Sequence, residues 1–139
     1  MYDKENIFAK ILRGDIPSIK VYEDEYTLAI MDVMPQEQGH VLVIPKLESE
    51  NILDEMDDEH SLALMKTMQK IARATKEAMQ ADGITIHQFN GEAGGQSVFH
   101  LHFHIIPRFD AKPLAPHSEK MADPGELNAV AEKIRSAIR

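Results

Sequence analysis

Three histidines at alternate positions are the residues of this 139-residue sequence best suited to chemistry. They form the run His100, Leu101, His102, Phe103, His104, in which apolar residues separate the histidines. Imidazole is largely neutral near pH 7, so its lone pair can attack phosphorus, and water can later cleave the resulting phosphoramidate. His-x-His is also a spacing that binds zinc. The run therefore predicts either a histidine nucleophile acting on phosphate or a metal site.

The local structure of the run decides how its side chains point. We predict a strand from about Val98 to Pro107, on which alternate side chains share a face and the three imidazoles line one surface. If Nδ1 of His102 donates to a backbone carbonyl, its Nε2 presents a lone pair to phosphorus. Another histidine of that face then contacts a phosphate oxygen. No Asp or Glu lies within the run to orient metal ligands, although carboxylates from elsewhere could approach.

The rest of the pattern predicts an α+β domain built on an antiparallel sheet. Helical periodicity and capping residues predict helices over 7–13, over 58–81 and after Asp123 and Pro124. Alternating or continuous apolar runs predict strands over 21–22, 27–31, 40–45 and 84–89. Asp57 is expected to cap the long helix, and Gly83 to take the left-handed position after it.

Composition limits the classes of partner. The length fits one domain over residues 1–139, and a net charge of −8 without a basic stripe argues against a nucleic-acid polymer, which favours a small ligand. There is no cysteine, so disulfides and thiolate metal sites are excluded. No apolar run is long enough to span a membrane, and residues 1–10 lack the apolar core of a signal peptide. We therefore expect a cytoplasmic protein that does not bind membranes.

The histidine run and its surroundings resemble the signature of the histidine triad (HIT) family, His-φ-His-φ-His-φ-φ with φ apolar. The stretch from Gly94 to Phe99 is similar to the purine nucleoside phosphoramidase branch, and Gly39 to Lys46 to the upstream strand of that family. The resemblance covers about 6–108 and leaves 109–139 as a C-terminal extension. It implies a HIT-like fold, with a five-stranded antiparallel sheet, a long helix, and shorter N- and C-terminal helices.

The resemblance also implies catalytic roles. His102 would be the nucleophile that becomes nucleotidylated, His104 would contact a non-bridging phosphate oxygen, and His100 would support His102 through its main-chain carbonyl. His40 is similar to the histidine that steadies the triad. Ser97 is similar to the hydroxyl that serves the phosphate or the leaving group.

A second group of residues would hold the nucleotide. The resemblance places the Asp32 carboxylate at the ribose hydroxyls. It places Asn90 on the phosphate or leaving-group side, and the donors of Gly95 and Gln96 near the phosphate. An apolar slot for a purine would be formed by a set that also fits a plain core: Ile7, Phe8, Val21 and Val33.

One departure from the family pattern, and one residue that distinguishes its branches, refine these expectations. Asn6 and Ala9 stand where some members carry the Cys-x-x-Cys of a structural zinc site, so we expect neither a metal nor a cofactor. The third histidine is present where the uridylyltransferase branch has Gln, which favours hydrolysis over transfer to a sugar phosphate. The remaining histidines match no family position and are expected to be packed or solvated: His60, His87 and His117.

The sequence thus predicts a nucleotide hydrolase that releases a nucleoside 5′-monophosphate from a phosphoramidate or related conjugate through a nucleotidyl-histidine. One alternative within this class is a dinucleoside polyphosphate hydrolase. Two others are a metal-dependent phosphoesterase that uses the three histidines as ligands and a non-catalytic nucleotide-binding protein. The resemblance further implies a purine nucleotide as substrate and a homodimer, to which a methionine-rich stripe on the long helix is suited.

Overall fold

A five-stranded antiparallel sheet forms the centre of the computed structural model, which describes residues 1–117 and 120–139. Positions 118 and 119, in the predicted C-terminal extension, lie outside the described residues. The strand order is β1-β2-β3-β5-β4. The strands are β1 Lys20–Glu23, β2 Thr27–Met31, β3 Val41–Pro45, β4 Gly83–His87 and β5 Phe103–Arg108.

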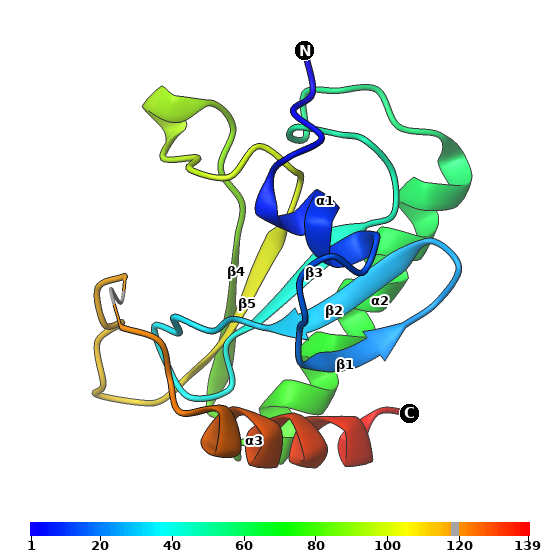
Figure 1. Ribbon diagram of the computed structural model, residues 1–139. Helices are drawn as coiled ribbons and strands as arrows, with labels where there is room; N and C mark the ends of the chain where they lie inside the picture. Colours follow the sequence, from blue (N-terminus) through cyan, green and yellow to red (C-terminus); the bar gives the residue numbers. More distant parts are fainter. Residues whose placement is uncertain (118–119) are drawn as a thin grey trace.

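Helices cover both faces of this sheet (Figure 1). Helix α1 (Ile7–Leu12) lies on one face, while the long helix α2 (Asp58–Ala78) and α3 (Pro124–Ala137) pack on the other. A short 3-10 turn, η1 (Glu92–Gly94), lies between β4 and β5. The architecture confirms the predicted α+β class, with a five-stranded antiparallel sheet, one long helix and two shorter ones.

The central strand β3 shows why both faces are apolar. Val41 and Val43 point toward the cluster formed with α2 and α3, whereas Leu42 and Ile44 point toward Phe8 of α1. All five residues of β3 are buried, so the strand reads as a continuous apolar run without alternation. Because Leu42 is the register partner of His104, the α1 face of β3 and β5 is also the face that carries His104.

Capping residues set where the helices begin. The side chains of Asn6, Asp57 and Asp123 accept hydrogen bonds from Ala9, His60 and Glu126 N–H, respectively. The Asp57 and Asp123 caps were expected from the sequence and are confirmed. The role predicted for Gly83 is wrong, because the left-handed residue after α2 is Gln80, with φ of 52°, and Gly83 is the first residue of β4.

The predicted strand from Val98 to Pro107 is also wrong at its start. β5 begins only at Phe103, and the stretch before it is irregular. Leu101 N–H donates to the carbonyl of Ser49 at 2.7 Å, a contact with a loop and not with a neighbouring strand. Of the three histidines, only His104 therefore lies in a strand. The alternation of side chains along a strand thus does not place His100 and His102 on the same face of the sheet as His104.

Two further features position the site. Gly39, immediately before His40, has φ of 97°, and a Cβ there would lie 2.8 Å from Met79 Cγ, so this turn requires glycine. After β5 the chain crosses the loop that follows β2, where Ala122 N–H donates to Val33 O at 2.8 Å. In the part of the chain that the structure describes, no helix is both long and apolar enough to cross a membrane.

Candidate active site

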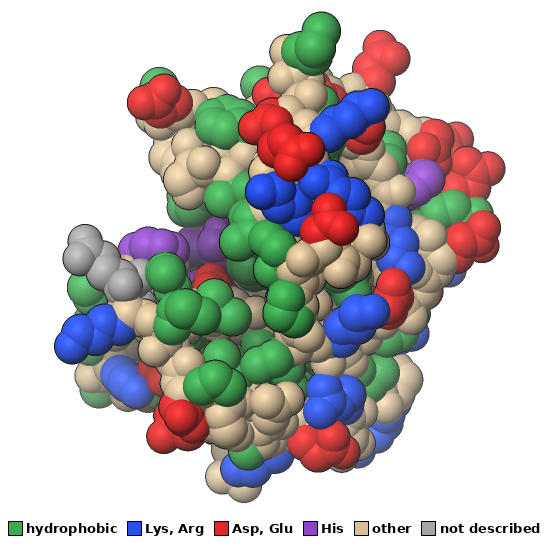
Figure 2. All heavy atoms as spheres, viewed as in Figure 1, with side chains coloured by type: hydrophobic (Ala, Val, Ile, Leu, Met, Phe, Trp, Pro, Cys, Tyr) green, Lys and Arg blue, Asp and Glu red, His purple; other side chains and the backbone are tan. Residues whose placement is uncertain are grey.

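Histidines from neighbouring strands meet on the α1 face of the sheet. His104 on β5 is the register partner of Leu42 on β3 and of His87 on β4. His40 directly precedes β3, and His102 directly precedes β5. Figure 2 shows histidine surface exposed in a recess on this side of the molecule. The recess is therefore the candidate active site.

His100 is withdrawn from this recess and is fully buried. Its Nε2 lies 3.0 Å from the carbonyl of Pro45, which can only accept, so Nε2 carries the proton. Nδ1 is then a lone pair that accepts from the Tyr2 hydroxyl at 2.5 Å. Burial lowers the pKa of His100 to about 4, so the ring is neutral at pH 7.

The main chain of His100 fixes the next histidine. Nδ1–H of His102 donates to the carbonyl of His100 at 2.6 Å, so Nε2 of His102 holds a lone pair. The Phe8 ring packs edge-on against His102, with 4.8 Å between ring centroids. Burial also lowers the pKa of His102, which keeps this lone pair unprotonated at neutral pH. His102 therefore has the form that a nucleophile needs.

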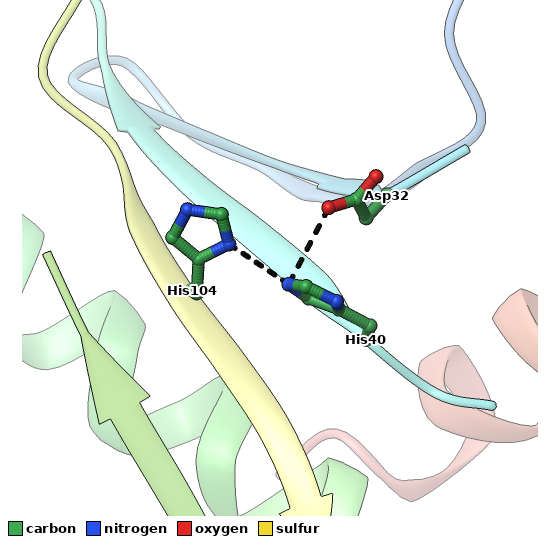
Figure 3. A group of neighbouring side chains, drawn as sticks. All are labelled: Asp32, His40 and His104. Carbon is green, nitrogen blue, oxygen red and sulfur yellow. Dashed lines mark hydrogen bonds and ion pairs between the residues drawn. The ribbon is translucent and has the colours of Figure 1, made fainter. Parts of the chain in front are cut away.

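A chain of hydrogen bonds fixes the opposite arrangement at His104. Gln36 N–H donates to Nδ1 of His40 at 3.1 Å, so His40 carries its proton on Nε2. That Nε2–H donates to Nδ1 of His104 at 2.9 Å and faces Oδ2 of Asp32 at 3.4 Å (Figure 3). His104 must then carry its proton on Nε2. Burial lowers the pKa of His40 to about 4 and that of His104 further, so both rings are neutral.

These tautomers give the two Nε2 atoms opposite hydrogen-bonding roles: that of His102 is an acceptor and that of His104 is a donor. Among the described residues, neither Nε2 of His102 nor Nε2 of His104 has a hydrogen-bond partner, and neither is a buried unpaired atom, so solvent reaches both. The two ring centroids are 5.1 Å apart. A lone pair on one ring and an N–H donor on the next can attack a phosphorus atom and hold one of its oxygens.

The glycine loop lies beside these rings. Gly95 has φ of 97°, and a Cβ there would approach the Phe89 ring, which is itself 5.9 Å from His104. The Gln96 side chain makes four hydrogen bonds within the protein: it donates to the carbonyls of Glu50 and Val98 and accepts from Gly91 N–H and Asn51. In this structure the Gln96 amide therefore braces the loop and does not point a free donor at the recess.

Ser97 and Asn90 occupy different surroundings. Ser97 is exposed and lines an open depression of about 470 Å³ together with Ile7 and Val98. Asn90 accepts hydrogen bonds from Ile52 N–H at 2.9 Å and from the Gln88 amide at 2.6 Å. Ser97 thus has an accessible hydroxyl, whereas Asn90 joins β4 to the loop before α2.

The four apolar residues assigned to the nucleotide slot divide between two surroundings. Phe8 contacts His102, and Ile7 is exposed and lines the depression with Ser97. Val21 is only 3% exposed and belongs to the core cluster on the α2 side, against which Val33 also packs. Val21 therefore serves as core, the role that its residue type already allowed.

Two sets of side chains were candidates for a metal. The three-histidine set is not assembled, because both ring nitrogens of His100 are engaged away from the recess. Ligand atoms of Asp32, His40 and His104 do lie within 4.8 Å of one another. However, Nδ1 of His40 accepts from Gln36 N–H, so a metal on its Nε2 would need an imidazolate or a broken hydrogen bond. The donor set fits a proton-bearing chain better than a metal.

Sequence reasoning missed three residues around the triad. Tyr2 donates to His100, Gln36 fixes the tautomer of His40, and His87 packs 4.5 Å from His104 between ring centroids. Tyr2 and Gln36 act through contacts between segments distant in sequence or through a backbone amide, which leave no local pattern. His87 had a signal, because it alternates with Ile84 and Ile86 on a strand that could flank the triad strand.

Comparison with known proteins defines the class to which this fold and site belong. The family model of the HIT domain matches residues 13–111. A solved structure of a Hit-like protein from Bartonella henselae superposes with a TM-score of 0.91 at 51% identity, covering 99% of this chain and 100% of that one. The chain belongs to the HIT family.

Two curated relatives extend this comparison. The Protein hit of Bacillus subtilis is 49% identical over 110 residues, 78% of this chain and 75% of that protein. An adenosine 5′-monophosphoramidase of Schizosaccharomyces pombe is 35% identical over 140 residues, 96% of this chain and 98% of that protein. Similarity to the yeast enzyme thus extends beyond the histidine run to nearly the whole of both chains.

Proposed function

We propose that this protein is a nucleotide hydrolase that releases a nucleoside 5′-monophosphate from a phosphoramidate or related conjugate. The observation that carries the proposal is the pair of opposite tautomers: a lone pair on Nε2 of His102 beside a proton on Nε2 of His104, both open to solvent. The monophosphoramidase name of the similar yeast protein supports the choice of substrate class.

The reaction has two displacements at phosphorus. In the first, the lone pair of His102 Nε2 forms a P–N bond while the bond to the leaving group breaks, and the leaving group takes up a proton. In the second, water forms a P–O bond, the P–N bond breaks and a proton is released. Nε2–H of His104 donates to a non-bridging oxygen in both steps, where charge develops. The Ser97 hydroxyl serves the leaving group, from the exposed position next to Ile7.

Recognition of the nucleoside falls to two groups. The Asp32 carboxylate accepts from the ribose hydroxyls, and its Oδ1 is already held by Met34 N–H at 2.8 Å. Phe8 and Ile7 provide the apolar contact for a purine, since Phe8 lies against His102. Replacing Asp32 with Asn is expected to raise KM for ribonucleotide substrates more than for their 2′-deoxy counterparts, which would erase the preference for ribose.

The direct test is hydrolysis of adenosine 5′-phosphoramidate by the wild type and by His102→Ala and His102→Asn. Loss of at least about 10³-fold in kcat/KM supports the proposal. Retention of most turnover on phosphoramidates and dinucleoside polyphosphates alike would reject His102 as the nucleophile. His60→Gln is the matched control, because His60 lies at the start of α2 and binds Asp57.

We further propose that two copies pair through the edge strand β4 and the adjoining end of α2. β4 lies at one end of the sheet, and its Ile86 and Phe89 just after it are exposed. Ile52 and Met65 are also exposed and line one shallow cavity, and Ile52 N–H is bonded to Asn90 at the end of β4. Light scattering should give a dimer for the wild type and a monomer for Ile86→Lys. A monomeric wild type would contradict this.

A further inference from the structure

His87 faces the active site although no step of the proposed reaction uses it. Its ring lies 4.5 Å from that of His104 between centroids, with the planes at 77°, and packs on Phe89 at 5.0 Å on another side. The other rings around His104 are farther away: His40 and His102 at 5.1 Å and Phe89 at 5.9 Å. His87 is therefore the nearest of the rings that enclose His104.

A histidine at position 87 is expected to lower the stability of the fold. In the described part of the chain, Nε2 of His87 is buried and has no hydrogen-bond partner. An unpaired buried polar atom costs stability, whereas an apolar side chain of similar size would fill the same space without that cost. Fold stability alone thus gives no reason for an imidazole at position 87.

The place of His87 in the sheet suggests what it does. It is directly opposite His104 in the β4–β5 register, so its side chain and that of His104 emerge on the same face. His104 is held at Nδ1 by His40, which leaves its ring free to tilt about that hydrogen bond. Contact from His87 on the β4 side restricts this tilt.

We propose that His87 is a positioning residue that holds the His104 ring so that Nε2–H points at the phosphate. This inference rests on the proposed hydrolase function. His87 touches neither the phosphate nor the reacting atoms, and it acts through His104. The sequence predicted a packed or solvated role for His87, and this proposal adds a role in the active site to its packing against His104 and Phe89.

Titratable groups around His87 should make this role measurable in a pH profile. The groups that face it across the site are His104 and His102, with His40 and Asp32 beyond them, and His117 acts on His40 and His104 from the segment after β5. Burial is the main cause of the lowered pKa of His102, and the positive charge that His87 gains when it is protonated lowers that pKa further. Burial also lowers the pKa of His87, so this charge appears only on the acid side of neutrality. Removing the imidazole lets that pKa rise, so the nucleophile becomes protonated at a higher pH and the acid limb of kcat/KM moves upward.

The experiment compares His87→Phe and His87→Gln with the wild type and with His60→Gln. His87→Phe should melt at the same temperature as the wild type or higher, because it removes the unpaired nitrogen. Its kcat should fall by about three- to tenfold with KM within about twofold, since only the orientation of His104 is disturbed. The acid limb should move upward in both His87 variants and stay in place in the control.

Each other outcome counts against the inference. An unchanged kcat and pH profile in folded His87→Phe would show that His87 does not position His104. A lower melting temperature with an unmoved acid limb would assign it a purely structural role. If His87→Phe does not fold, His87→Gln decides by the same two readouts. His102→Ala separates the proposals: activity retained there rejects the hydrolase mechanism, whereas its loss beside a silent His87 variant rejects only this inference.

Discussion

His100 and His102 are chemically identical side chains two residues apart, yet their surroundings are opposite. Both ring nitrogens of His100 are bonded inside the protein, to Tyr2 and to Pro45, and the ring has no exposed surface. Only Nδ1 of His102 is bonded, and its Nε2 opens on the recess. The difference teaches that hydrogen-bond partners, and not position within the run, suit His100 to a structural role and His102 to the nucleophilic role that we propose.

The largest expected effects come from exchanging alanine into these two positions. His102→Ala should lower kcat/KM by at least about 10³-fold and lower the free energy of unfolding less than His100→Ala does, because His102 is only partly buried and makes one ring hydrogen bond within the protein. His100→Ala should instead lower the free energy of unfolding by about 2–4 kcal/mol, since it leaves a cavity and removes two buried hydrogen bonds. Steady-state kinetics and urea unfolding on both variants check the pair, and the reverse pattern would break the comparison.

A smaller effect on catalysis is expected at His40. His40→Phe removes the donor that fixes the tautomer of His104, so the His104 proton is no longer confined to Nε2. We expect kcat to fall by about 10- to 100-fold while KM changes little. A pH-independent loss confined to KM would mean that His40 serves nucleotide binding instead.

Acidification should destabilise the fold through the buried rings of His40 and His100. Since burial holds the pKa of His40 and His100 at about 4, the unfolded chain binds protons at a higher pH than the folded protein does. The free energy of unfolding should therefore fall as the pH decreases from about 6.5 to about 4, by about 1–3 kcal/mol for each ring. Urea unfolding at several pH values measures the slope, which His100→Gln should reduce and His60→Gln should preserve.

The smallest effect is expected at Tyr2, whose hydroxyl donates to the buried His100. Tyr2→Phe keeps the ring but removes the hydroxyl that donates to Nδ1 of His100, which leaves a buried acceptor unpaired. The free energy of unfolding should fall by about 1–3 kcal/mol, with kcat nearly unchanged at 25 °C. Equal stability of the variant and the wild type would show that the hydrogen bond from Tyr2 to His100 does not stabilise the fold.

Much of the fold was predictable because its signals are local. The long helix follows from its apolar period and from Asp57, whose side chain caps it as expected. Strand β2 runs over the predicted residues 27–31. The start of β5 was not predictable, because the apolar alternation of residues 98–102 suits a strand, while a backbone bond from Leu101 to Ser49 diverts the chain.

The candidate site divides in the same way. The histidine run and the resemblance singled out His102, His104 and His40, which the structure brings together. Val21 was assigned to the nucleotide slot because a buried valine and a ligand-contacting valine look alike in sequence. The alternation around His87 indicates a strand, but the contact of His87 with His104 depends on the pairing of β4 with β5, which that alternation does not specify.

The most direct measurement is localisation of the covalent intermediate. Wild-type protein mixed rapidly with adenosine 5′-phosphoramidate is quenched in base, which preserves phosphoramidates, and the peptide that contains His100, His102 and His104 is fragmented in a mass spectrometer. One adenylyl group on His102, absent from folded His102→Ala, is the predicted result. An adenylyl group on His100 or His104, or full turnover by His102→Ala, would contradict the assignment of the nucleophile.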